Sequence, residues 1–413
     1  MRILHTSDWH LGKNLEGFSR LDEQAEFLEE FIEIVKQRDV DLIIIAGDIY
    51  DTGNPPARAE KLFYSALKSI SEGGKRAVLV IAGNHDNPER LMAASPLAYE
   101  HGVILLGTPK SAAEVGEYGG FKIIESGEGF VEIEVKGKRA VILTLPYPSE
   151  KRLNEILTEE TDEIERKKSY SDRVNSIFQK LSEKYREDTI NLAVSHIFIS
   201  GGEESKDSER PIQLGGGLAV DEICLPDKAQ YIALGHLHRP QRISRRLNAY
   251  YAGSPIQYSK SEINYSKCSY LVEVEAGEDP SIEEILFKNY KPIEVFKCSS
   301  IEDALERCQE NKDRKIWAYF EIDTDRVLNQ SEIKRMKELI PDIVEIIPKM
   351  KGVDDLDSEE RDIREKSMTV LFREFYKSSR SAEISMELMD LFMDITKEEG
   401  EDDETQEAQD IGA

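Results

Sequence analysis

The 413-residue chain is poor in cysteine, with only four, and none of them belongs to a Cys-x-x-Cys pair. This spacing argues against a disulfide scaffold or a zinc knuckle and favours a reducing cytoplasm. No stretch approaches the roughly 18 uninterrupted apolar residues of a membrane span, so we expect no association with a membrane. The N-terminus becomes polar by His5, unlike a secretory signal.

Basic residues are also scarce: 54 Lys and Arg stand against 81 Asp and Glu, for a formal net charge of −27. Such a balance argues against a nucleic-acid partner, because phosphate binding needs a basic surface. The charge is uneven, however. Residues 350–413 hold 20 acidic and 8 basic side chains, which is −12 of the total, and no carboxylate occurs between Lys228 and Ser261. The arginines of this window are predicted DNA contacts, although a solvated loop explains them equally well; they are Arg239, Arg242, Arg245 and Arg246.

Apolar runs alternate with amphipathic stripes in the first part of the chain. Runs at Arg2–Thr6, Leu42–Ala46 and Ala77–Ala82 predict strands, and stripes within 21–35 and 62–70 predict helices. An unbroken run is typical of a strand buried on both faces. The alternation predicts an α/β protein with a parallel sheet core and helices on both of its faces.

The later part of the chain predicts further elements. The Lys- and Glu-rich stretch 150–188 predicts a helical insertion on the surface, and 293–348 predicts a small β-α-β-α-β domain. Two amphipathic helices and an acidic tail, expected to be disordered, follow. The later strands are expected at Ala140–Leu145, Ile190–Val194, Tyr231–Leu234 and Ala249–Ala252. The predicted domains are 1–280, 285–349, the helical segment 357–397 and the tail 398–413.

Five short polar segments each follow a predicted strand. Open α/β sheets bind ligands beyond the carboxyl ends of their strands, so side chains far apart in sequence can meet there. A lone histidine at a strand end is more often structural, which is the interpretation kept for His5 and His101, but five segments in this order form a specific pattern. The segments are Asp8-Trp9-His10, Gly47-Asp48, Gly83-Asn84-His85-Asp86, Ser195-His196 and Gly235-His236-Leu237-His238.

These segments offer two carboxylates, one amide and four imidazoles as metal ligands. This mixture suits manganese, iron or zinc, and the lack of a thiolate argues against a closed structural zinc site. Seven ligands are too many for one ion, and Asp48 is the natural bridge between two. Two cations about 3.5–4 Å apart suit phosphodiester hydrolysis, because they activate water and offset charge on the attacking and leaving oxygens. The predicted ligands are Asp8, His10, Asp48, Asn84, His196, His236 and His238.

His85 directly follows a predicted ligand, Asn84, and can lie beside the metal pair without binding it. We predict that His85 protonates or stabilises the leaving oxygen, and that Asp86 orients its imidazole. His85 and Asp86 are the predicted catalytic residues.

The pattern D-x-H, GD, GNHD, H, GHxH resembles the calcineurin-like metallophosphoesterase superfamily. The segments HTSDWHLG, AGDIYD, GNHDNPERL, SHIFISGG, SERPIQLGG, ALGHLHRPQ and YAGSPIQYS are similar to SbcD-type DNA nuclease subunits, strongly over residues 1–275. The resemblance implies a manganese-dependent exonuclease and endonuclease that acts on DNA ends, hairpins and single strands in repair, recombination and replication. Magnesium, iron or zinc could substitute. It also implies a cytoplasmic location with the nucleoid.

The same resemblance assigns sites and partners. It implies one manganese on Asp8, His10, Asp48 and His238, another on Asp48, Asn84, His196 and His236, and His85 acting on the scissile phosphodiester. It further implies a capping domain at 285–349 and a homodimer joined to an SbcC-type coiled-coil ATPase through 357–397, as a heterotetramer. Archaeal and eukaryotic relatives tend to carry histidine at the position of Asp51, so Asp51 is left out of the catalytic set.

Two other functions stay open. A stand-alone phosphatase or small-molecule phosphodiesterase could use the same scaffold, but it would need neither the second α/β domain nor the C-terminal helices. A scaffold that binds DNA without cutting predicts a broken ligand set, whereas all seven ligands are present. For the C-terminal helices, packing on the chain's own core is the alternative to docking on an ATPase.

Overall fold

The computed structural model describes residues 1–153, 163–205, 219–350 and 388–389. The predicted helical segment 357–397 and the acidic tail 398–413 therefore lie outside the described residues, apart from two positions. Among the helices of the described part of the chain, none is long and apolar enough to cross a membrane.

The chain divides into two compact units, and both are discontinuous in sequence. The first is Met1–Val295 with Asp313–Tyr319 and Asp342–Glu345; the second is Phe296–Lys312 and Phe320–Pro341 with the chain from Ile346 on. The boundary runs through three strands, and the predicted domain limits remain predictions.

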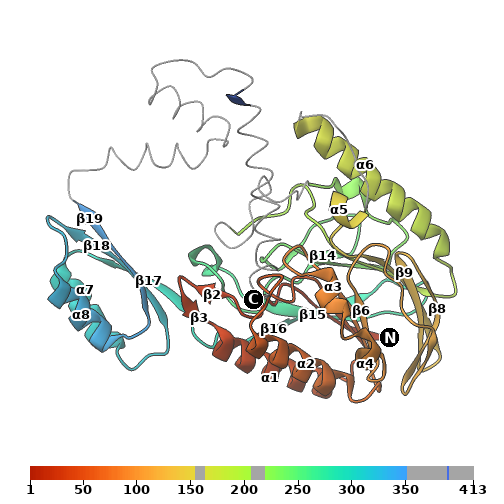
Figure 1. Cartoon of the computed structure of the whole chain (residues 1–413), viewed down its shortest axis with the longest axis horizontal. Helices are drawn as coiled ribbons and strands as arrows, with labels where there is room; N and C mark the ends of the chain where they lie inside the picture. Colours follow the sequence, from red (N-terminus) through yellow and green to blue (C-terminus); the bar gives the residue numbers. More distant parts are fainter. Residues whose placement is uncertain (154–162, 206–218, 351–387, 390–413) are drawn as a thin grey trace, which may run out of the picture. The chain divides into compact units, whose positions relative to one another are not determined.

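The first unit is built on two sheets (Figure 1). The first sheet contains β1 (Arg2–Thr6), β4 (Leu42–Ala46), β5 (Ala77–Ile81), β6 (Val103–Leu106), β15 (Cys268–Glu273) and β16 (Ser281–Leu286). The second contains β7 (Gly116–Tyr118), β8 (Phe121–Gly127), β9 (Phe130–Val135), β10 (Lys138–Leu145), β11 (Ile190–His196), β12 (Tyr231–Gly235), β13 (Gln241–Arg242) and β14 (Ala249–Tyr251). Their strand orders are β16-β15-β1-β4-β5-β6 and β13-β14-β12-β11-β10-β9-β8-β7.

The two sheets pack face to face. Ile44 and Ile81 of the first sheet share one buried cluster with Ile142, Val194 and Ala233 of the second. The sequence predicted these strands but not their division between two sheets, because an apolar run looks the same whether a helix or a second sheet covers it.

Helices cover the outer face of each sheet (Figure 1). Helices α1 (Leu21–Gln37) and α2 (Ala57–Ser71) bury Phe27, Phe31 and Phe63 against the first sheet. Helix α6 (Glu163–Leu181) buries Val174 and Phe178 against the second. The predicted α/β core with helices on both sides is confirmed, although both sheets also contain antiparallel pairs. Helix α6 lies within the predicted helical stretch 150–188, and its apolar side chains make it part of the layer on the second sheet. The remaining short elements of this unit include β2 (Asn14–Leu15), β3 (Phe18–Ser19), α3 (Pro88–Met92), α4 (Ser95–Tyr99), α5 (Glu150–Leu153) and the 3-10 helices η1 (Ser182–Lys184), η2 (Glu222–Cys224) and η3 (Lys260–Glu262).

A three-stranded sheet of order β17-β18-β19 follows. Its elements come in the predicted β-α-β-α-β order: β17 (Ile293–Cys298), α7 (Ile301–Asn311), β18 (Trp317–Thr324), α8 (Gln330–Leu339) and β19 (Ile343–Met350). Ser300 caps α7 by accepting a bond from the Asp303 amide, and Asn329 forms a capping box with Glu332 at α8. These caps satisfy amides that the first helical turn leaves without partners.

The parallel strands place the predicted ligands at one end of the sandwich. β1, β4 and β5 are parallel neighbours in the first sheet, as are β11 and β12 in the second. Asp8, Asp48 and Asn84 follow the first three strands, and His196 and His236 lie at the ends of the other two. Ligand-bearing residues from both sheets therefore come from the carboxyl ends of parallel strands.

Glycine is required where the ends of β4 and β12 approach each other closely. A Cβ atom added to Gly235 would lie 1.8 Å from the Ala46 carbonyl oxygen and 2.8 Å from Nδ1 of His196. Gly47 has φ +91°, and a Cβ there would lie 2.3 Å from the same His196 nitrogen. No larger residue fits at Gly235 unless the two sheets move apart.

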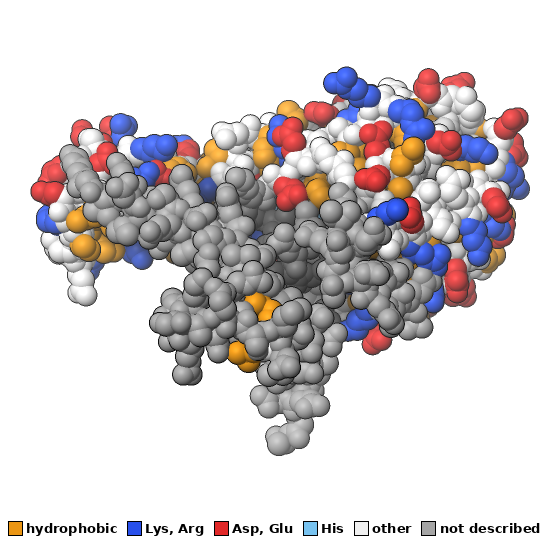
Figure 2. Space-filling view, turned by 90° about the horizontal axis from the view of Figure 1, so that it is seen from above, with side chains coloured by type: hydrophobic (Ala, Val, Ile, Leu, Met, Phe, Trp, Pro, Cys, Tyr) orange, Lys and Arg blue, Asp and Glu red, His pale blue; other side chains and the backbone are white. Residues whose placement is uncertain are grey.

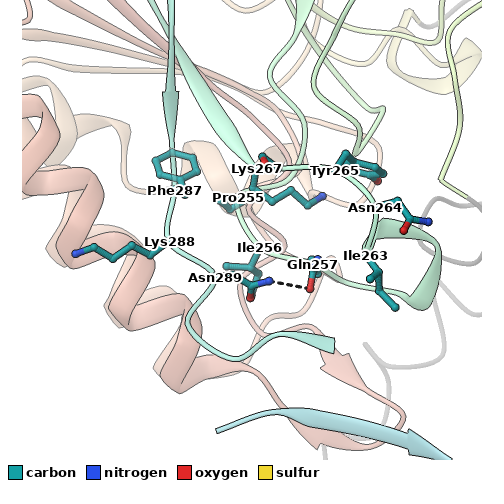
Figure 3. A pocket seen from close by; sticks show the side chains of 11 residues that line it. Pro255, Ile256, Gln257, Ile263, Asn264, Tyr265, Lys267, Phe287, Lys288 and Asn289 are labelled. Carbon is teal, nitrogen blue, oxygen red and sulfur yellow. Dashed lines mark hydrogen bonds between the residues drawn. The ribbon is translucent and has the colours of Figure 1, made fainter. Parts of the chain in front are cut away.

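The chain between β14 and β15 and the residues after β16 line a cavity of about 360 Å³. On the face of the molecule seen in Figure 2, Lys and Arg side chains alternate with Asp and Glu side chains over the described surface. The cavity, drawn in Figure 3, includes Gln257, Tyr265, Lys267 and Asn289 among its lining residues.

Replacing Gly235 with alanine is expected to lower the free energy of unfolding by about 1–3 kcal/mol, because the added methyl group overpacks the contact between the sheets. Gly53→Ala is the matched control, since its Cβ would meet only ordinary contacts at 3.5 Å or more. Urea denaturation of the two variants and the parent chain measures the difference. Equal midpoints for the two variants would contradict the close approach described above.

Candidate metal centre

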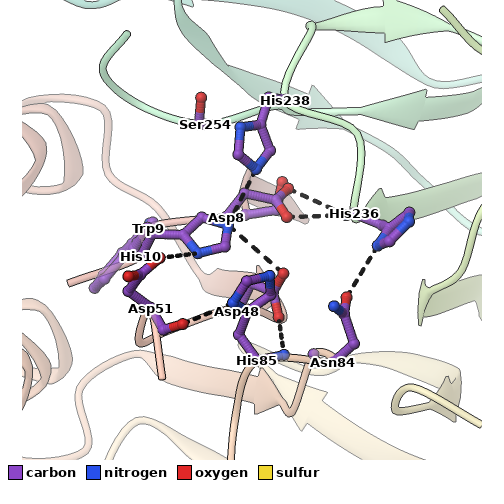
Figure 4. Close-up of polar contacts among 12 residues, drawn as sticks. Asp8, Trp9, His10, Asp48, Asp51, Asn84, His85, His236, His238 and Ser254 are labelled. Atoms are coloured by element: carbon purple, nitrogen blue, oxygen red, sulfur yellow. Dashed lines mark hydrogen bonds and ion pairs between the residues drawn. The ribbon is translucent and has the colours of Figure 1, made fainter. Parts of the chain in front are cut away.

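Six predicted ligands form two buried groups at the strand ends. Figure 4 labels all of them except His196. Within each group the candidate ligand atoms lie within 4.8 Å of one another. All six side chains are 7% exposed or less. One group is Asp8, His10 and His238; the other is Asp48, His196 and His236.

The loops that carry these residues adopt an unusual backbone conformation. Asp8, His10, Asp48 and His236 have φ values of 52°, 43°, 50° and 110°. Non-glycine residues seldom adopt positive φ, and such strain persists only where the surroundings enforce it. Here the Asp8 amide donates to the Gly47 carbonyl and the His10 amide to the Asp48 carbonyl, each at 3.0 Å, so the loops after β1 and β4 run side by side.

In the first group, two imidazole nitrogens face each other. Nε2 of His10 lies 3.0 Å from Nε2 of His238. The Asp8 carboxylate accepts the backbone N–H of His236 at 3.0 and 3.2 Å. Two ring nitrogens this close need a proton or a cation between them.

In the second group, the Asn84 side chain joins the histidines. Its Oδ1 lies 3.0 Å from Nε2 of His196 and 3.0 Å from Nδ1 of His236. Oδ2 of Asp48 lies 3.3 Å from Nε2 of His196 and 3.6 Å from Nε2 of His10. Asp48 thus faces both groups, which is the position that the sequence predicted for a bridging ligand.

Burial sets the protonation of these side chains. It raises the pKa of Asp8 to about 6, although nearby imidazoles oppose the shift. It lowers the pKa of His10 and of His236 to about 3, so both rings are neutral and keep a lone pair for a cation. Despite the burial of the pair, Asp48 raises the pKa of His196 to about 9, while His196 holds the pKa of Asp48 below its usual range. A divalent cation could take the place of the proton in that pair.

The donor set fits a divalent metal. Neutral imidazoles, carboxylates and an amide oxygen suit borderline ions such as manganese, iron and zinc. One ring nitrogen of His196 already has a hydrogen-bond partner, because Nδ1 donates to the Ala46 carbonyl at 2.8 Å. That bond leaves Nε2 as the ring atom for a metal.

His85 lies beside the first group. Its backbone N–H donates to Oδ1 of Asp48 at 2.8 Å, and Nδ1 donates to the Asp51 carbonyl at 2.6 Å. Its ring centroid is 4.7 Å from that of His10, with the two planes perpendicular. Asp51 itself, with His10 and His85, forms a third cluster of possible ligands, and Nζ of Lys13 lies 2.8 Å from its carboxylate.

Asp86 does not have the predicted position. Its buried carboxylate accepts backbone N–H groups of Ile49, Tyr50 and Gly83 at 3.1, 3.0 and 2.8 Å. The ring nitrogen Nδ1 of His85 donates to the Asp51 carbonyl and not to this carboxylate, so the expectation that Asp86 orients the ring through that nitrogen is wrong. The Asp51 carbonyl accepts the hydrogen bond that orients the His85 ring. Asp86 links the loop after β4 to the loop after β5 through its bonds to the backbone.

Sequence reasoning missed two residues at this site. Arg152 of α5 donates from Nη1 to the Gly83 carbonyl and from Nη2 to the Asp86 carbonyl, both at 2.6 Å. Glu262 is fully buried, and its Oε1 lies 3.2 Å from Nδ1 of His238. Neither residue carried a signal, because each is one charged side chain in a polar stretch of sequence.

The predicted DNA-contacting arginines differ in their surroundings. Arg239 pairs with Glu203, and Arg242 donates to the Leu247 carbonyl at 3.2 Å. Arg245 and Arg246 are exposed. The stretch from Lys228 to Ser261 contains no carboxylate, but one of its arginines thus pairs with a carboxylate from another part of the chain. DNA contact by these arginines stays a prediction.

Residues 1–240 match the family described as "Calcineurin-like phosphoesterase", and residues 289–380 match "Type 5 capsule protein repressor C-terminal domain". The SbcD subunit of the nuclease SbcCD from Bacillus subtilis (strain 168) is 40% identical over 406 residues, covering 98% of this chain and 100% of that protein. The protein of the same name from Staphylococcus epidermidis (strain ATCC 12228 / FDA PCI 1200) is 29% identical over 346 residues, covering 83% of this chain and 84% of the relative.

Solved structures with similarity include a novel archaeal phosphodiesterase, with 10% identity and a TM-score of 0.30 over 70% of this chain and 100% of that one. A dimetal phosphatase from Danio rerio has 11% identity and a TM-score of 0.36, over 68% of this chain and 98% of that one. The sequence relationships are decisive, since one family covers more than half of the chain and one relative aligns along nearly all of it. The chain therefore belongs to the calcineurin-like phosphoesterases and, among them, to the SbcD nuclease family, and it is a metal-dependent phosphodiester hydrolase.

Proposed function

We propose that this chain is the nuclease subunit of an ATPase–nuclease complex and that it cuts DNA with two manganese ions. The observation that carries the proposal is the pair of buried ligand groups with Asp48 between them. The relatives named as SbcCD nuclease subunits support DNA as the substrate. Free ends, hairpins and single strands are the proposed DNA structures, in repair, recombination and replication within the cytoplasm.

Each ion would have four ligands from this chain. Two bound cations supply charge that offsets the anionic phosphate and lowers the pKa of an attacking water. The four imidazoles favour manganese over magnesium, and iron or zinc could substitute. One ion would be held by Asp8, His10, Asp48 and His238, and the other by Asp48, Asn84, His196 and His236.

His85 is the proposed general acid. The Asp51 carbonyl holds the Nδ1 hydrogen, so in the doubly protonated ring Nε2 is the atom that would pass its proton to the leaving oxygen, which leaves a neutral imidazole. The bond from its backbone N–H to Asp48 keeps the ring beside the metal ligands. Asp86 and Arg152 act indirectly, because their bonds hold the loop that carries His85.

The substrate and partner surfaces are proposed from the exposed arginines, the predicted C-terminal helices and the names of the relatives. Arg245 and Arg246 are exposed and could neutralise DNA phosphates, with Arg239 and Arg242 next to them in sequence. Residues 357–397 would bind an SbcC-like coiled-coil ATPase by the apolar stripes of their predicted helices. The relatives' names include an SbcCD complex, and we propose a homodimer joined to the ATPase as a heterotetramer.

His85→Gln is expected to lower manganese-dependent cutting of a blunt duplex and of a hairpin at least about 100-fold, because the leaving oxygen loses its acid. Asp48→Asn should abolish cutting, since both ions lose a charged ligand. Gel assays with and without a chelator measure both effects. His101→Gln is the matched control, because His101 is exposed and outside the ligand groups.

Undiminished cutting by His85→Gln would contradict the role of that residue. A parent chain that hydrolyses an aryl phosphodiester but cuts no DNA, even when the ATPase partner and ATP are added, would refute DNA as the substrate. A parent chain that is inactive on both substrates in manganese would refute the metal centre.

Truncation after Lys351 is expected to abolish association with the ATPase and to spare metal-dependent cutting, because it removes the apolar stripes and leaves both ligand groups. Co-purification of the two proteins measures association. Truncation after Lys397 is the control, since it removes only the acidic tail. A complex that survives the first truncation would contradict docking through 357–397.

A further inference from the structure

An ion pair is buried behind one of the proposed ligands. Glu262 ends the short helix η3 (Lys260–Glu262) and is 0% exposed, and Lys267 is 6% exposed. Nζ of Lys267 contacts Oε2 of Glu262 and donates to Oγ of Ser254 at 2.7 Å and to the His238 carbonyl at 3.0 Å. The pair thus reaches both the backbone and, through Glu262, the ring of His238.

Stability does not account for this arrangement. Removing a carboxylate and an ammonium from water costs several kcal/mol for each ion, and well-packed apolar side chains of similar volume are often as stabilising. The pair does provide a negatively charged acceptor at a fixed point. Oε1 of Glu262 lies 3.2 Å from Nδ1 of His238, within hydrogen-bonding distance.

We infer that Glu262, with Lys267 as its counter-ion, is a positioning residue that holds His238 in the orientation needed to bind a metal. Glu262 accepts the Nδ1 hydrogen, so the lone pair of His238 is on Nε2. That atom faces Nε2 of His10 at 3.0 Å, in the group that includes Asp8. The inference rests on the proposed role of His238 as a metal ligand.

The two ligand groups differ in the acceptor that holds the Nδ1 hydrogen of a histidine ligand. In the second group, the corresponding bond runs from Nδ1 of His196 to a neutral backbone carbonyl, that of Ala46. A carboxylate acceptor makes an imidazole a stronger ligand than a carbonyl does, and loss of such a partner weakens metal binding about 10–100-fold. Removing Glu262 should therefore weaken the ion held with His238 and leave the ion held with His196.

The surroundings allow the charges to be removed. Lys267 lines the cavity of about 360 Å³ (Figure 3), so methionine at this position has room to pack. Exchanging both charged residues together avoids leaving one buried charge without its partner. Double variants can therefore separate the effect of losing the hydrogen-bond acceptor at position 262 from the effect of losing the ion pair.

The test compares E262Q/K267M with E262L/K267M. Both variants lack the ion pair, but only glutamine keeps an oxygen that can accept the Nδ1 hydrogen of His238. Binding of Mn²⁺ is followed through the electron paramagnetic resonance signal of the free ion during titration of the full chain. We expect one of two bound ions to be held about 10–100-fold more weakly by E262L/K267M than by E262Q/K267M. Circular dichroism and thermal melting confirm that both variants are folded, and E262M/K267M replaces the leucine variant should it not fold.

Equal affinity of the two variants for both ions would overturn the inference, and so would equal weakening of both ions in the leucine variant. The parent chain separates these results from failure of the proposed function. A parent that binds no Mn²⁺ refutes the metal centre itself. A parent that binds two ions, beside variants that do not differ, refutes only the positioning role of Glu262.

Discussion

The close approach of the two sheets at the ends of β4 and β12 is the contact on which the site depends. The Ala46 carbonyl accepts a bond from His196 of the opposite sheet at 2.8 Å, and Gly235 packs against the same carbonyl. At this contact Oδ2 of Asp48, which follows a strand of the first sheet, lies 3.3 Å from Nε2 of His196, the last residue of β11 in the second sheet.

The same approach puts charged groups where water is excluded, and other loops then supply their partners. Asp8 accepts the amide of His236, Asp48 accepts the amide of His85, and Asp86 accepts three backbone amides. A buried carboxylate without such bonds would be strongly destabilising. The bonds therefore stabilise the site and at the same time fix the ligand loops relative to one another.

The rear of the first ligand group is held by the chain after β14. Tyr258 donates its hydroxyl hydrogen to the Trp9 carbonyl, and Gln24 of α1 donates to the His10 carbonyl at 2.8 Å. Glu262 lies in the same segment. The loop that carries Asp8 and His10 is thus supported by residues from distant parts of the sequence, and in a buried network each member keeps the others in place.

The sequence by itself determined the strands that carry the predicted ligands, the long helices and the strand-end motifs, because periodicity and residue chemistry are local properties. It indicated Asp48 as the bridge, and the structure places this residue between the two groups. Tertiary structure alone decided that the strands divide between two sheets, that Asp86 bonds backbone amides instead of His85, and that Arg152 and Glu262 belong to the site. These features depend on contacts between residues far apart in the chain, and in sequence a buried charged residue looks the same as an exposed one.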